Sequence, residues 1–200
     1  MHKILIIFIG LLLPATAWAI GSPSTNFFMK GVYHPMMVPA HLIALFSLGL
    51  LLGQQGWRMI RIALAVFLFI LIASLIMTRY HTAFWDTELV LLPLAALTGV
   101  LVIFKWNLNP TVPLIISVIA AIVIGLDSSV PRIPGLQTAK IYSHLAGSGA
   151  FVGLLLLLVS LIALPLRSIL NGIVLRILGA WSTAGAVLVI TLLLVADITP

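Results

Sequence analysis

The sequence predicts an all-α integral membrane protein, a bundle of about six transmembrane helices that follows an N-terminal signal peptide. The first observation is composition: of 200 residues, 62% are hydrophobic and 7% are charged, and mean hydropathy is +1.30. A soluble domain carries about a quarter charged residues, so this composition excludes a water-soluble globular protein. The second observation is that apolar stretches recur between short turns. The third is the order of residues at the start of the chain.

Residues 1–19 have the order of a bacterial secretory signal. A basic start at Lys3 precedes an apolar run over residues 4–13, and small residues follow near Ala19. We expect cleavage after Ala19, which leaves residues 20–200 as a single transmembrane domain. The alternative is an uncleaved first transmembrane helix, but a run of about ten residues is shorter than the roughly 17 needed to cross a bilayer.

The first three expected spans cover residues 34–53, 62–78 and 88–104. Each is an apolar stretch long enough to form a helix across most of the hydrocarbon layer. The polar residues 54–56, which end in glycine, predict a turn after the first span. Residues 107–110, which contain two asparagines and a proline, predict a turn after the third.

The last three expected spans cover residues 112–126, 141–164 and 177–196. The Asn-Gly pair at residues 171–172 predicts a turn before the last span. No segment between spans is long enough to fold as a second domain, so residues 20–200 should form one helical bundle.

The charged residues predict an orientation in the bacterial cytoplasmic (inner) membrane, with the mature N-terminus outside. In that arrangement the cytoplasmic side carries Arg58, Arg61, Lys105, Arg167 and Arg176. The outer side carries Lys30, Arg79, Arg132 and Lys140. The carboxylates Asp86, Glu88, Asp127 and Asp197 all fall at or near outer ends. Because acidic residues contribute little to orientation, we interpret their position as an indication of function.

Several function classes are excluded or disfavoured. The basic residues are scattered singly, which disfavours nucleic-acid binding. The sequence has no cysteine, so it cannot form a disulfide or a thiolate metal site, and it has no Gly-rich Lys-Ser/Thr motif for ATP. The segment around Ser148 resembles the serine motif of rhomboid proteases, but residue 146 is alanine and no histidine follows His144. We therefore expect no enzymatic activity.

The segment from Tyr33 to Leu50 carries the most informative pattern. His34 and His41 are seven residues apart and return to nearly the same face of a helix. Pro35 and Pro39 remove backbone donors, so the start of this helix should be irregular or kinked and leave carbonyls free. Two imidazoles beside free carbonyls can hold a divalent transition metal, or they can be hydrogen-bonded within a helix end.

This segment resembles the first helix of the HupE/UreJ family, membrane proteins associated with hydrogenase and urease gene clusters and regarded as nickel or cobalt permeases. The residues that carry the resemblance are His34, Pro35, His41, Leu42, Ala44 and Gly49. Two positions depart from the family pattern, because Ala40 stands where the family has aspartate and Val38 where it has glycine. The loss of that carboxylate removes a charged ligand.

Weaker likenesses lie further along the chain. Residues 142–147 are similar to the family's fifth-helix His-Leu-Ala-Gly segment, and residues 178–185 to its last helix. Residues 125–130 stand where the family carries a second pair of histidines, which this sequence lacks.

The candidate metal site consists of His34, His41, Asp127 and His144, all expected in the outer half of the bundle. Hydrogen bonding at helix ends is the alternative role for the histidines, and an interfacial position in water is the alternative for Asp127. The resemblance implies a permease or delivery protein for nickel or cobalt, with the ion as transported substrate and no tightly bound cofactor.

The expected partners are the lipid bilayer, a divalent metal ion and a metalloenzyme-maturation or membrane protein. The alternative function is a membrane assembly or accessory subunit that binds another membrane protein without transporting an ion.

Overall fold

The computed structural model describes residues 26–78, 86–104, 108–128 and 138–198. This part of the chain contains α-helices and one short 3-10 helix, and no strand. The predicted all-α class is therefore confirmed, while the expected signal peptide lies outside the described residues. The α-helices are α2 (Phe27–Met37), α3 (Pro39–Gln55), α4 (Trp57–Met77), α5 (Thr87–Phe104), α6 (Thr111–Asp127), α7 (Thr138–Leu166) and α8 (Ile173–Ile198).

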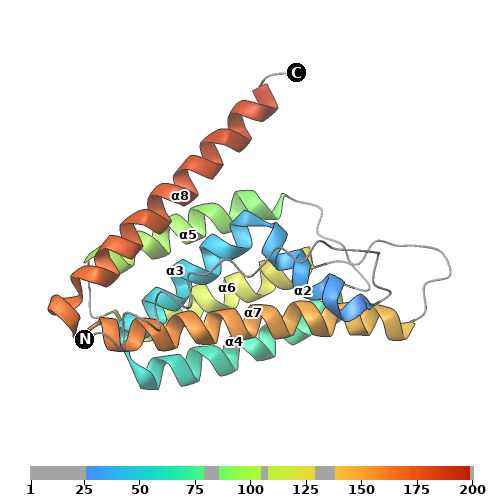
Figure 1. The fold of residues 1–200 in the computed structure, drawn as a ribbon, viewed down its shortest axis with the longest axis horizontal. Coiled ribbons are helices and arrows are strands. Elements are labelled where there is room, and N and C mark those ends of the chain that lie inside the picture. The colour runs from blue at the N-terminus through green and yellow to red at the C-terminus, as the bar shows by residue number, and fades with distance from the viewer. Residues whose placement is uncertain (1–25, 79–85, 105–107, 129–137, 199–200) are drawn as a thin grey trace, which may run out of the picture.

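Helices α3 to α7 run side by side along the long axis of the molecule (Figure 1). The short helix α2 lies across one end of this bundle and packs on α7. Helix α8 packs mainly on α5 near its own start and then leans away toward the C-terminus. The bundle core consists of apolar side chains from α3 to α8, with Phe67 its largest fully buried member.

Four of the described helices, α4, α5, α7 and α8, are long and apolar enough to cross a membrane. Helices α2 and α3 form a pair bent by 77° that counts as a fifth, broken span. Helix α6 is a shorter apolar helix of 17 residues, at the lower limit of the length that crosses a bilayer. These helices occupy the places of all the expected spans, so the chain is a helical membrane protein.

The structure changes the start of the first expected span, which begins at Phe27 instead of His34. The chain leaves helical geometry at Val38 and resumes at Pro39, the first residue of α3. A proline is well suited to a first helical position because it has no N–H to satisfy there. The irregular helix start that the two prolines predict is thus confirmed, as a sharp bend between two helices.

Helix α4 begins at Trp57, five residues before its predicted start at residue 62. The prediction placed Arg58 and Arg61 before the span, on the cytoplasmic side. In the structure both lie in the first turns of the helix and are exposed. A long arginine side chain can reach the membrane surface from such a position, so its charge does not end the helix.

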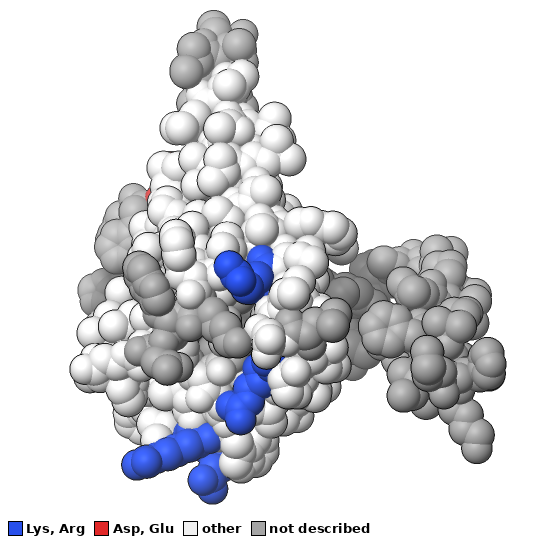
Figure 2. Space-filling view, turned by 90° about the vertical axis from the view of Figure 1, so that its left-hand side faces the viewer, with Lys and Arg blue, Asp and Glu red and all other residues white. Residues whose placement is uncertain are grey.

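The charges are distributed unequally between the two ends of the bundle. Figure 2 looks onto the end where α4 and α8 begin, and it shows a cluster of basic side chains. The described basic residues of these segments are Arg58, Arg61, Arg167 and Arg176. The opposite end, where α5 begins and α6 ends, carries the described carboxylates Asp86, Glu88 and Asp127. The predicted grouping thus holds for these three acids, and Lys30 and Lys140 lie at the same end beside Phe27.

Candidate functional site

Close contact between α2 and α7 positions the first histidine of the candidate site. A Cβ at Gly31 would overlap the carbonyl oxygen of His144, and a Cβ at Gly147 would overlap that of Phe28. The two backbones therefore touch at a place where only glycine leaves room, a common arrangement between helices in membranes. His34 lies one turn beyond Gly31 and is thereby placed beside α7.

His41 lies in the first turns of α3 and faces the C-terminal end of α6. Its Nε2 atom lies 3.1 Å from Oδ2 of Asp127. This is the distance of an ion pair, and neither ring nitrogen of His41 has any other partner among the described residues. The side chain is fully buried, so water cannot satisfy these nitrogens. An unsatisfied buried imidazole facing a carboxylate is an arrangement suited to accepting a cation between the two groups.

Asp127 also contacts His34 and Thr87. Nε2 of His34 lies 3.3 Å from the Asp127 carbonyl oxygen and 3.9 Å from its Oδ2 atom. The Thr87 hydroxyl donates a 2.5 Å hydrogen bond to Oδ1. The last residue of α6 is thus held by side chains from α2, α3 and α5.

His144 lies on α7, and its ring centroid is 6.1 Å from that of His34. Its Nε2 atom is buried and has no hydrogen-bond partner. One turn further on, the Ser148 hydroxyl donates to that of Ser128, which donates to the Ile124 carbonyl. This buried pair of hydroxyls connects α7 to the end of α6 directly beside Asp127.

Exposure differs across the cluster. The side chains of His34 and Asp127 are 31% and 23% exposed, whereas His41 is fully buried. The cluster is therefore open where α2 meets α6 and closed toward the bundle interior. An ion arriving from this end would meet His34 and Asp127 before His41.

The side chains present can contribute nitrogen and oxygen ligands, the combination that suits nickel, cobalt and zinc. Within the described ranges, no group of three His, Asp or Glu is placed to hold a metal ion in this conformation. The centroid distance of 6.1 Å separates His34 from both His41 and His144. Small inward movements of these rings would be needed for several of them to contact one ion.

The structure brings the four predicted residues to one end of the bundle: His34 contacts Asp127, His41 contacts Asp127, and His144 lies next to His34. Their role as metal ligands remains a prediction. Sequence reasoning missed Thr87, which is the first residue of α5. The sequence did contain one indication of its role, because Thr87 directly precedes Glu88 at the acidic start of the third expected span.

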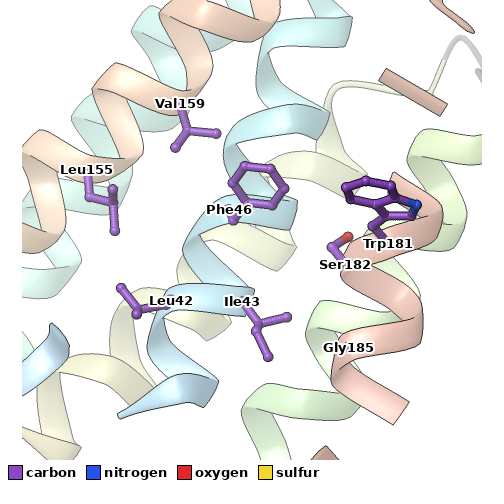
Figure 3. Close-up of a pocket in the computed structure, with 8 residues that line it drawn as sticks. All are labelled: Leu42, Ile43, Phe46, Leu155, Val159, Trp181, Ser182 and Gly185. Carbon is purple, nitrogen blue, oxygen red and sulfur yellow. The ribbon is translucent and has the colours of Figure 1, made fainter. Parts of the chain in front are cut away.

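An apolar groove of about 390 Å³ lies elsewhere, between α3, α7 and α8. Figure 3 shows its lining: Leu42, Ile43, Phe46, Leu155, Val159, Trp181, Ser182 and Gly185. The Ser182 hydroxyl already donates to the Gly179 carbonyl. The groove contains no ionisable side chain, and it is separate from the histidine cluster.

Comparison with known proteins gives one match. No curated protein and no solved structure matches the chain. The family model described as HupE / UreJ protein matches residues 6–189, which is most of the chain. This agrees with the resemblance of the segment that supplies His34 and His41. The chain is therefore a member of the HupE/UreJ family.

Proposed function

We propose that this protein is a permease or delivery protein for a divalent transition metal ion, nickel or cobalt, in the bacterial cytoplasmic membrane. The observation that carries the proposal is that three imidazoles and one carboxylate from four helices gather at one end of the bundle. Family membership implies, more generally, an accessory membrane protein linked to nickel or cobalt.

The state of the ring nitrogens supports a cationic substrate. A buried polar atom without a partner is unfavourable by about 1–3 kcal/mol. Nδ1 of His41 and Nε2 of His144 are such atoms, and Nε2 of His41 has only the Asp127 carboxylate beside it. A cation that accepts electron pairs from these nitrogens would compensate for this deficit, while Asp127 would balance part of its charge. Ionisable groups within a bilayer are rare, and such a cluster typically marks an ion pathway.

The looseness of the cluster is compatible with transport. An ion that is to be released must not be bound too tightly, so a permease requires favourable but incomplete coordination. In the proposed orientation the cluster faces the outside of the cell, with the mature N-terminus on the same side. The arginine-rich end shown in Figure 2 then faces the cytoplasm, as the excess of basic residues in cytoplasmic loops favours.

Nickel accumulation in bacterial cells that lack their own high-affinity uptake tests the proposal. We expect His41→Ala and Asp127→Asn to reduce accumulation to the level of cells without the protein. Asp127→Asn keeps the shape of the side chain and removes only its charge. The matched control is Ser47→Ala, because Ser47 is also buried on α3 but donates only to the Ala44 carbonyl of its own helix. Uptake is compared at equal amounts of protein in the membrane.

Accumulation by both site variants at the level of the unmodified protein would refute the proposed transport. A protein that causes no accumulation of nickel or cobalt above background would refute it as well.

The second candidate function is a non-transporting assembly subunit that binds another membrane protein. The observation that favours it is that no three ligands in the described residues are placed for metal binding. Copurification from the native membrane separates the two candidates. A stoichiometric protein partner, together with unchanged metal accumulation in the His41→Ala variant, would favour the assembly role.

A further inference from the structure

We infer that Thr87 determines the metal selectivity of the site by occupying one oxygen of Asp127. This inference rests on the proposed function. It concerns a residue outside the four candidate ligands, and it specifies the substrate class as ions that prefer imidazole to carboxylate.

The hydrogen bond of Thr87 joins two helices and ends on a carboxylate, whereas Thr98 and Ser117 donate within their own helices and Thr78 and Ser148 donate to a carbonyl and a hydroxyl of another segment. Thr98 donates to the Leu94 carbonyl, which is four residues earlier in its own helix. Ser117 on α6 behaves in the same way and donates to the Pro113 carbonyl. Thr87 is the first residue of α5 and has no preceding helical turn of its own to accept its proton. Its hydroxyl instead donates across the bundle to Oδ1 of Asp127.

This bond divides the roles of the two carboxylate oxygens. Oδ1 accepts the Thr87 hydroxyl at 2.5 Å, whereas Oδ2 lies 3.1 Å from Nε2 of His41 and 3.9 Å from Nε2 of His34. Thr87 is almost fully buried, so water does not compete effectively for its hydroxyl. Oδ1 is thus directed toward Thr87 with one lone pair in use, so a cation that approaches the imidazoles would meet Oδ2.

The number of available oxygens discriminates between classes of divalent ion. Calcium takes six to eight oxygen ligands, often with a bidentate carboxylate, and magnesium and manganese also prefer oxygen. Nickel, cobalt and zinc accept imidazole nitrogen readily. A site with one free carboxylate oxygen among three imidazoles therefore disfavours calcium, magnesium and manganese. Thr87 is thus a positioning residue that makes the carboxylate monodentate.

The test is competition between manganese and nickel during uptake by cells that express Thr87→Val, Thr87→Ala or Thr87→Ser. The valine variant keeps the size of the side chain, and both it and the alanine variant lack the hydroxyl. In these two variants we expect about tenfold less manganese to be enough to halve nickel accumulation. The reason is that the free energy of a hydrogen bond to a charged group corresponds to about a tenfold change in affinity. Thr87→Ser keeps the hydroxyl and should keep the original selectivity.

Thr98→Val is the matched control, because it removes a buried hydroxyl from the same helix without affecting Asp127. A change of the manganese-to-nickel ratio in Thr87→Val or Thr87→Ala, but not in Thr87→Ser or Thr98→Val, would support the inference. A loss of uptake that leaves this ratio unchanged would show a purely structural role and overturn it. Absence of metal accumulation by the unmodified protein would instead refute the proposed function on which the inference rests.

Discussion

Replacing Gly31 by alanine should displace α2 from α7 and take His34 out of the cluster. Gly31 stands where the two backbones meet, and one added methyl group would enter the space occupied by His144. Alanine is about 1 kcal/mol more favourable than glycine within a helix, so helix propensity alone predicts stabilisation. A destabilising effect would therefore report on the contact between the helices.

The size of the effect follows from the distances at this contact. The new Cβ would lie 2.8 Å from the carbonyl carbon of His144 and 3.0 Å from the Ser148 nitrogen, in addition to overlapping the carbonyl oxygen. Ordinary contact begins at 3.4 Å, so relieving the carbon contact alone requires 0.6 Å of separation, and relieving the oxygen overlap requires more. These are backbone atoms, which cannot rotate away as a side chain can. Overpacking of this kind is unfavourable by about 1–3 kcal/mol.

The displacement should also affect function, because the hydrogen bond from His34 to the Asp127 carbonyl is already 3.3 Å long. Thermal unfolding of the purified protein in detergent and nickel accumulation in cells are the two assays. Gly185→Ala is the matched control, since a Cβ at Gly185 would meet nothing within 4 Å. We expect a lower unfolding temperature and less nickel uptake for Gly31→Ala only. Equal behaviour of the two variants would refute the proposed role of the backbone contact.

Three other perturbations test the packing and the orientation. Gly99→Ala should weaken the packing of α8 on α5, because the new Cβ would meet backbone and side-chain atoms of α8. The unfolding temperature should therefore fall, and an unchanged unfolding temperature would contradict this packing. Ser148→Ala should destabilise the fold by about 1 kcal/mol through loss of the hydrogen bond to Ser128, measured by the same assay, and a stabilised variant would contradict that role. The sequence has no cysteine, so single cysteines at Lys30 and Arg58 can be labelled selectively in intact cells with a membrane-impermeant thiol reagent. We expect labelling at residue 30 and protection at residue 58, and the reverse pattern would invert the proposed orientation.

The sequence by itself determined the class of protein and the approximate positions of its helices. Each apolar stretch must satisfy its own backbone groups in the bilayer, so composition along the chain is sufficient to predict a helix there. The bend at Val38 was predictable for the same local reason, because Pro35 and Pro39 interrupt the hydrogen-bond pattern. The approach of His34 to His41, with ring centroids 6.1 Å apart, does not come from the predicted single helix face, because the two residues lie in separate helices that meet at a bend of 77°.

Only the tertiary structure decided which groups from distant segments meet. His34 and Asp127 are 93 residues apart in the sequence, and their contact depends on how α2 crosses α7 at Gly31 and Gly147. The bond from Thr87 to Asp127 likewise requires the start of α5 to lie beside the end of α6. The positions of the helices follow from the free energy of transferring each apolar segment into lipid. This free energy is a sum over the residues of the segment. Contacts between helices depend instead on close packing and small residues at crossing points, and hydropathy contains no information about these.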